Sequence, residues 1–102
     1  MARATIVLRQ KIVDVDGNIR ELAIWELPAT VDAPAGVKYR LAFVRRGEAK
    51  PVVLYDNHSP KGDHRHIKGI EEAYRFVDVS RLVADVLVDV RRIVEDEEWP
   101  RR

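Results

Sequence analysis

The sequence predicts an α+β fold in which an antiparallel sheet of about five strands packs on one C-terminal α-helix. Three observations support this class. Short runs between residues 4 and 77 alternate apolar and polar side chains, as half-buried strands do. Turn residues separate these runs, so neighbouring strands are expected to pair antiparallel through hairpins. A final run places apolar residues at steps of three and four, which indicates an amphipathic helix.

A first hairpin is expected over residues 4–15 and 19–27. In residues 4–15 (ATIVLRQKIVDV) one phase of the alternation is mostly apolar and the other is partly charged. The turn Asp16-Gly17-Asn18 follows, and Gly and Asn tolerate the positive φ angles of tight turns. Residues 19–27 (IRELAIWEL) also have some helical propensity, but the turn and the alternation favour a return strand.

A second hairpin is expected over residues 37–46 and 51–57. The loop 28–36 (PATVDAPAG) precedes it, with two prolines and a glycine. Residues 37–46 (VKYRLAFVRR) show the clearest alternation in the chain, with Tyr39 and Phe43 on the apolar face. Four basic residues occupy the other face or the end of this strand, and they form either an ordinary exposed surface or part of a phosphate-tracking groove. These residues are Lys38, Arg40, Arg45 and Arg46.

The last elements are a strand over residues 72–77 and a helix over residues 79–95. Asp78 is a good N-cap, because its side chain can accept a hydrogen bond from the first turn. The apolar face comprises Leu82, Val83, Val86, Leu87, Val90, Ile93 and Val94. The remaining charged positions are expected to face solvent, and they are Asp85, Asp89, Arg91, Arg92 and Asp96.

Composition limits the classes of function. The 102 residues fit a single domain, with 46% hydrophobic and 34% charged residues and a net charge of +1. There is no cysteine, which excludes disulfides, thiolate metal sites and thiol nucleophiles. No apolar run approaches the length of a signal peptide or a membrane span, so a soluble cytoplasmic protein with no membrane partner is expected.

Side chains capable of chemistry gather in residues 55–69 (YDNHSPKGDHRHIKG), which hold all three histidines. If this stretch is extended, His64 and His66 share one face and Arg65 lies opposite. Two histidines and a cation suit metal-free phosphodiester cleavage. One imidazole takes the proton of a ribose 2′-hydroxyl, the other protonates the leaving oxygen, and Lys61 or Arg65 stabilises the phosphorane.

Two other interpretations of this segment remain open. Asp56, His58, His64 and His66 supply nitrogen and oxygen ligands for a divalent metal such as zinc, nickel or manganese. The segment is otherwise an ordinary structural or partner-binding loop, with its histidines solvated or bonded to the backbone. The residue types alone do not decide among the catalytic site, the metal site and the ordinary loop. The ordinary loop is the simplest of these interpretations.

Several features of the second half of the chain occur together. They are Tyr55-Asp56-Asn57, the histidine-rich basic segment, Gly69-Ile70-Glu71, Tyr74-Arg75-Phe76, and a terminal helix with Leu82 and Asp85. In this combination, residues 53–93 resemble the TumE-like family of small bacterial and archaeal proteins, which are described as the toxins of toxin–antitoxin pairs.

The resemblance implies a toxin whose cognate antitoxin is a small DNA-binding protein. Many small toxins of this kind cleave RNA, in agreement with the chemistry of the histidine segment. We therefore expect an RNA substrate, no cofactor, acid–base roles for His58, His64 and His66, and substrate contacts from Asn57, Lys61 and Arg65. The alternative is a non-catalytic interaction module, conceivably a homodimer, whose histidine segment binds a partner or a metal.

Overall fold

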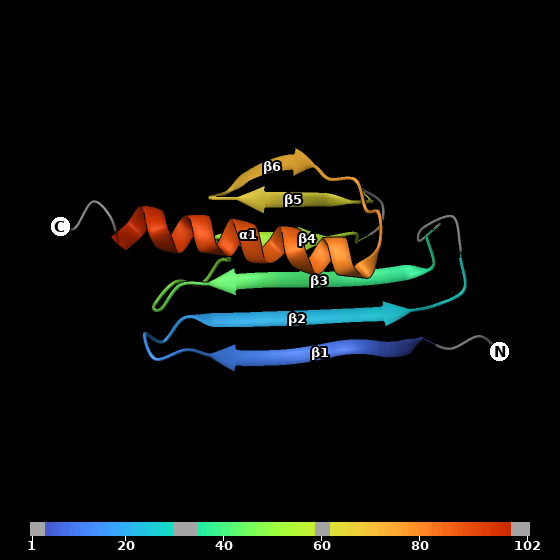
Figure 1. Cartoon of the computed structure of the whole chain (residues 1–102), viewed down its shortest axis with the longest axis horizontal. Coiled ribbons are helices and arrows are strands. Elements are labelled where there is room, and N and C mark those ends of the chain that lie inside the picture. The colour runs from blue at the N-terminus through green and yellow to red at the C-terminus, as the bar shows by residue number, and fades with distance from the viewer. Residues whose placement is uncertain (1–3, 30–34, 59–61, 99–102) are drawn as a thin grey trace.

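The computed structural model describes residues 4–29, 35–58 and 62–98, and within these ranges the chain forms six strands and one helix (Figure 1). The elements are β1 (Thr5–Val13), β2 (Ile19–Glu26), β3 (Val37–Val44), β4 (Val53–Asp56), β5 (His64–Ile67), β6 (Ile70–Ala73) and α1 (Val79–Glu98). The strands follow one another in the sheet in chain order, and every neighbouring pair is antiparallel. The predicted α+β class, with an antiparallel sheet and a C-terminal helix, is confirmed.

The sheet has one strand more than expected because the histidine segment is itself half of a hairpin. β5 and β6 are joined by Lys68 and Gly69, whose φ angles are 52° and 81°. Positive φ at both central residues is the signature of the two-residue turn that fits the twist of a hairpin. The predicted strand over residues 72–77 was wrong, since the strand is Ile70–Ala73 and residues 74–78 lie outside regular structure.

The helix begins where the N-cap was predicted. The backbone N–H of Arg81 donates to Asp78 Oδ1 at 2.7 Å, which satisfies one of the free donors of the first turn. The helix lies across the sheet over β4 (Figure 1). Its apolar face packs on the apolar residues of β2, β3 and β4 to form the core. The most buried side chains of this core are Ile24, Tyr39, Leu41, Phe43, Val53, Tyr55 and Leu82.

The two faces of the sheet therefore differ. Directly opposed residues of antiparallel strands point to the same face, so the register assigns every strand residue to the helix side or to the other side. We call the side away from the helix the open face. Its residues are Ile6, Arg9, Lys11, Val13, Ile19, Glu21, Ala23, Trp25, Lys38, Arg40, Ala42, Val44, Leu54, Asp56, His64, His66, Glu71 and Ala73.

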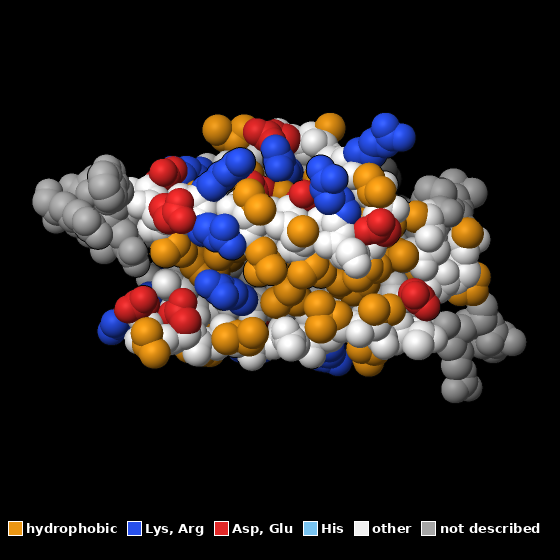
Figure 2. Space-filling view, in the orientation of Figure 1, with side chains coloured by type: hydrophobic (Ala, Val, Ile, Leu, Met, Phe, Trp, Pro, Cys, Tyr) orange, Lys and Arg blue, Asp and Glu red, His pale blue; other side chains and the backbone are white. Residues whose placement is uncertain are grey.

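The helix side is only partly covered. Figure 2 looks onto this side and shows hydrophobic side chains gathered between the helix and the first two strands, while acidic and basic side chains are interspersed along the helix. Ile12 of β1 and Leu87 of α1 each remain 45% exposed. The core is thus concentrated under the helix, beside β3 and β4.

Replacing Leu82 with Ala should lower the free energy of unfolding by about 2–5 kcal/mol, because Leu82 is fully buried between helix and sheet. Urea unfolding followed by circular dichroism measures the loss. Leu87→Ala on the same helix is the matched control and should cost less than about 1 kcal/mol. Equal losses for the two variants would contradict this packing of the helix.

Candidate functional site

The register of β5 against β4 decides where the side chains of the histidine segment lie. Arg65 is opposite Tyr55, and both point to the helix side. His64 is opposite Asp56, and His66 is opposite Leu54. The two histidines therefore share the open face, as the alternation predicted for an extended segment, and Arg65 lies on the other side of the sheet.

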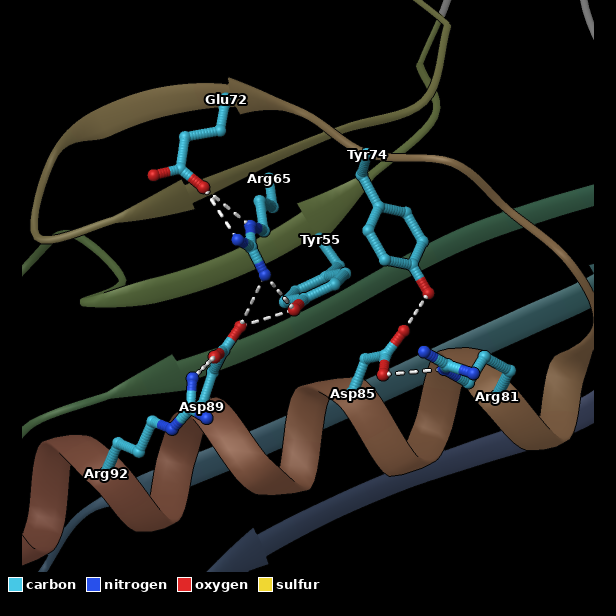
Figure 3. Close-up of polar contacts among 8 residues, drawn as sticks. All are labelled: Tyr55, Arg65, Glu72, Tyr74, Arg81, Asp85, Asp89 and Arg92. Atoms are coloured by element: carbon cyan, nitrogen blue, oxygen red, sulfur yellow. Dashed lines mark hydrogen bonds and ion pairs between the residues drawn. The ribbon is translucent and has the colours of Figure 1, made fainter.

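Arg65 is held by a polar cluster between the sheet and the helix (Figure 3). Its guanidinium lies 3.2 Å from Asp89 Oδ2 and 2.7 Å from Glu72 Oε2, and it donates to the Tyr55 hydroxyl at 3.1 Å. The Tyr55 hydroxyl in turn donates to the buried Asp89. Burial and this bond raise the pKa of the Tyr55 hydroxyl, so it remains a donor across the ordinary pH range.

This cluster does not support the predicted contact of Arg65 with a phosphate beside the imidazoles. The guanidinium is occupied by two carboxylates and a phenol, and the sheet separates it from His64 and His66. Strand periodicity is the physical reason, since neighbours along a strand point to opposite faces.

A second polar contact ties the connection after β6 to the helix. The Tyr74 hydroxyl donates to Asp85 Oδ2 at 2.7 Å, and Arg81 Nε donates to Asp85 Oδ1 at 3.0 Å (Figure 3). The bond from Tyr74 is the main reason that the pKa of Asp85 lies below its ordinary value. The prediction that Asp89 faces solvent was wrong, because its carboxylate is buried against Tyr55. Asp85 is still 28% exposed, and its carboxylate accepts from Tyr74 in the connection after β6.

His64 and His66 form a compact group with Glu71 of β6. The two imidazole centroids are 5.2 Å apart with the rings at 79°, and His66 Nε2 lies 3.3 Å from Glu71 Oε1. His64 Nδ1 lies 2.8 Å from the carbonyl oxygen of Gly62. A carbonyl only accepts, so Nδ1 must carry the proton, and Nε2 of the neutral ring keeps a lone pair.

Two lysines and the Arg45–Glu48 ion pair lie beside the exposed side of His66. A hollow beside the β3–β4 connection is lined by His66 and Leu54 together with Arg45, Lys50 and Lys68. Lys68 has a φ of 52°, the left-handed region that costs a residue with a side chain about 1–2 kcal/mol. A strained residue next to a candidate site is a reason to look for a role of its side chain.

The other predicted site residues lie elsewhere. Asn57 is committed to the backbone of β3, because its Oδ1 accepts from Tyr39 N at 2.9 Å and its Nδ2 donates to Val37 O at 2.7 Å. His58 is exposed just after β4 and lines a different hollow, over the open face of β1–β3. Asp56 lies on the open face and accepts from the His58 N–H. Lys61 lies outside the described residues.

Comparison with known proteins gives the family. A family model described as Toxin TumE matches residues 2–94. The chain belongs to the TumE toxin family. It is therefore the toxin component of a toxin–antitoxin pair, and its partner is an antitoxin. No curated protein and no solved structure matches the chain significantly.

The match to Toxin TumE begins at residue 2, so β1–β3 belong to the family unit together with the histidine hairpin. The resemblance noted in the sequence covered about residues 53–93, which is the part that carries polar motifs. In the part of the chain that the structure describes, no helix has the length and apolar character to cross a membrane.

Three residues to which the sequence analysis gave no role in a site belong to the polar cluster, to the histidine group or to the hollow beside it. Asp89 follows Leu82 by seven positions and Val86 by three, so helical spacing alone places it on the buried face. The two-residue turn Lys68-Gly69 brings Glu71 opposite His66, and Gly69 is the one residue of that turn whose type is typical of a hairpin.

Removing the Asp89 carboxylate should destabilise the protein strongly. Asp89→Ala leaves the Tyr55 hydroxyl and part of the Arg65 charge without their partner in a buried place, and loss of one partner of such a cluster costs about 3 kcal/mol. Urea unfolding measures it, with the exposed Asp96→Ala on the same helix as control. A loss below that of the control would show that this cluster contributes nothing to stability.

The Tyr74–Asp85 contact should make stability depend on pH. Because the folded-state pKa of Asp85 is lowered, its carboxylate stabilises the fold above the unfolded-state pKa of about 3.9, and this contribution disappears as pH falls through the lower folded-state value. Tyr74→Phe should therefore cost about 1 kcal/mol at neutral pH and less in acid. Unfolding curves at neutral and acidic pH test this, and a cost that grows in acid would contradict it.

Proposed function

We propose that this toxin cleaves RNA, with His64 and His66 as the acid–base pair. The observation that carries the proposal is the pair itself. Two imidazoles lie 5.2 Å apart on a sheet face that no described helix covers, and a carboxylate is within 3.3 Å of one of them. A general acid and a general base must both reach one phosphodiester, and two adjacent residues of one strand face satisfy this.

His64 is the better general base. Its Nδ1–H is held by the Gly62 carbonyl, so the neutral ring offers Nε2 to accept a proton. In the proposed step Nε2 takes the proton of a ribose 2′-hydroxyl while the 2′-oxygen attacks the adjacent phosphorus. This residue is only 9% exposed, so the ribose must approach along the open face.

His66 is the better general acid. Glu71 Oε1 lies 3.3 Å from His66 Nε2, where it can accept a hydrogen bond from the ring and orient the imidazole that gives the proton. As the bond from phosphorus to the 5′-oxygen breaks, the imidazolium protonates that oxygen. The products are a 2′,3′-cyclic phosphate and a 5′-hydroxyl, and the proton accepted by His64 balances the one given by His66.

The charge on the phosphorane needs a cation on the open side of the sheet. Lys50 and Lys68 line the hollow beside His66, and neither forms an ion pair or hydrogen bond through its side chain with another described residue. They replace Arg65 in the role that the sequence analysis gave it, since Arg65 lies on the other face. Ammonium groups so placed stabilise charge that develops on transferring phosphoryl oxygens.

His64→Ala and His66→Ala should each lower RNA cleavage by at least about a hundredfold and relieve growth inhibition, because general acid–base catalysis contributes that much. The double variant should lose little more than either single one, since the two residues act as a unit. Cleavage of a quenched fluorescent RNA oligonucleotide measures the rate, and circular dichroism verifies the fold.

Arg91→Ala is the control and should keep cleavage within about tenfold of the parent, because Arg91 is exposed on the helix and belongs neither to the His64–His66–Glu71 group nor to the open face. The corresponding DNA oligonucleotide should not be cut, since it lacks the 2′-hydroxyl. Toxicity that persists in a folded double variant would remove the catalytic role. Absence of cleavage between about pH 5 and pH 8 would leave a toxin that acts by binding alone.

A second candidate function rests on the same group. One ligand atom from each of His64, His66 and Glu71 lies within 4.8 Å of the others, which suits a three-ligand site for a divalent cation such as zinc. The bond from His64 Nδ1 to a backbone carbonyl is the kind of contact that orients metal-binding imidazoles. Of the metal ligands predicted from sequence, Asp56 and His58 are outside this group and Glu71 is added.

Elemental analysis separates the two candidates. Protein purified without a histidine tag should contain close to one equivalent of metal if the group is a metal site, and the content should fall in Glu71→Gln. A metal-free protein that cleaves RNA in the presence of a chelator supports the acid–base pair instead, because imidazoles bound to a metal have no lone pair with which to move protons.

A further inference from the structure

Positive charge is concentrated on the open face of the first three strands. Arg9, Lys11, Lys38 and Arg40 all lie there, against one carboxylate from the same strands, Glu21. None of these four cations forms an ion pair or hydrogen bond through its side chain with another described residue. Their charge is therefore available to a ligand.

On the helix side of the sheet, most arginines lie close to carboxylates. Arg65 and Arg81 each lie against carboxylates of the same side, and Arg92 is 3.9 Å from Asp89. Arg20 and Arg91 of this side form no ion pair with another described residue, but the carboxylates of the helix lie around them. The charges of that surface largely cancel, as the interspersed colours of Figure 2 show along the helix. An anionic ligand is therefore attracted to the open face and not to the helix.

The register connects this basic surface to the histidines. Successive cross-strand partners form one row across the sheet, from Arg9 through Ala23, Arg40 and Asp56 to His64. Neighbouring strands are about 4.8 Å apart, so four steps span roughly 19 Å. A second row runs parallel to it and ends at His66, and its members are Lys11, Glu21, Ala42, Leu54 and His66.

The open face is hollowed along the first of these rows, from Arg9 to Asp56, which is the neighbour of His64. The small side chain of Ala23 lies between Arg9 and Arg40, and a hollow over β1–β3 is lined by Trp25, Lys38, Arg40 and His58 among others. Trp25 is partly exposed there, opposite Lys38. An indole beside cations offers a flat surface on which an unpaired base can stack.

We propose that this hollow binds a short single-stranded segment of RNA that runs across the strands toward the histidine pair. Arg9 and Arg40 contact its phosphates, and Trp25 stacks on a base. Asp56 interrupts the basic row next to His64, and its carboxylate repels phosphate but accepts hydrogen bonds from a ribose hydroxyl or a base amino group. The sugar that reacts at His64 is thereby favoured at this position.

A single strand fits better than the alternatives. Bases in a duplex are paired and stacked, so they cannot lie on Trp25. An acidic protein segment would satisfy the cations but would not use the indole face. The inference rests on the proposed function for the reaction at His64 and His66, whereas binding in the hollow is a separate property that can be measured without cleavage.

The test uses a short fluorescein-labelled RNA oligonucleotide with 2′-O-methyl riboses, which cannot react, and the full chain. Fluorescence anisotropy gives Kd over a range of salt concentrations. Arg9→Ala/Arg40→Ala should raise Kd at least tenfold at about 50 mM salt and reduce the slope of log Kd against log salt by about 1.4, because two phosphate contacts to a single strand are lost.

The matched control is Arg91→Ala/Arg92→Ala, which removes the same charge from the exposed helix surface and should change Kd less than about threefold. Trp25→Ala should raise Kd at least fivefold with the salt slope unchanged, since stacking releases no ions. Lys11→Ala/Lys38→Ala tests the same surface independently and should act like the first pair, so the question stays decidable if one variant misfolds.

Equal weakening by the helix and open-face pairs would overturn the proposal, as would wild-type affinity in both open-face pairs. Failure of the parent protein to bind the oligonucleotide at low salt would also overturn the proposal. An acidic protein segment would then be the better candidate ligand of this surface. If the hollow binds RNA but His64→Ala/His66→Ala still cleaves it, the proposed catalysis fails and this inference stands. If the histidine variants no longer cleave RNA but the open-face variants still bind it with parental affinity, the proposed RNA-binding hollow is rejected. The proposed catalysis then stands.

Discussion

The contact among Tyr55, Arg65 and Asp89 is the constraint on which the rest of this protein depends. It joins β4, β5 and α1 through one buried carboxylate. A charge in that place is stable only if its partners stay, because desolvation of an unpaired carboxylate costs several kcal/mol. Arg65 is thereby held on the helix side. Since strand neighbours alternate, His64 and His66 have to lie on the open face, and a slip of β5 by one residue would exchange the two sets.

The two faces of the sheet consequently have different roles. On the helix side, carboxylates of the helix and of β6 are used to neutralise arginines and to hold tyrosines, which attaches the helix to the sheet. On the open face, cations remain without partners among the described residues, and the imidazole pair stands beside Glu71. Membership in the TumE family identifies a toxin. The open face is where the proposed chemistry and the proposed binding of RNA come together.

The predictions from sequence were correct where a local rule applied. Asp78 caps the helix, Gly17 has the positive φ expected of a hairpin turn, and Tyr39 and Phe43 are core residues. The predictions were less accurate in the second half of the chain, where short polar segments pair with one another. The β5–β6 hairpin was not predicted, because its strands are short and charged and Lys68-Gly69 is not one of the dipeptides that usually mark a two-residue turn. Nothing in the sequence indicated that Asn57, predicted to contact the substrate, hydrogen-bonds to the backbone of β3.

By itself the sequence determined the α+β class, the order of the elements, the apolar faces and the alternation of His64, Arg65 and His66, because these depend on periods of 2 and 3.6 and on turn chemistry within a few residues. Only the tertiary structure decided which face each set occupies. It also decided that Asp89 is buried, that Glu71 lies beside His66, and that Arg9 and Arg40 align with His64. These facts follow from strand register and helix packing, which join residues far apart in the chain and leave no local signal.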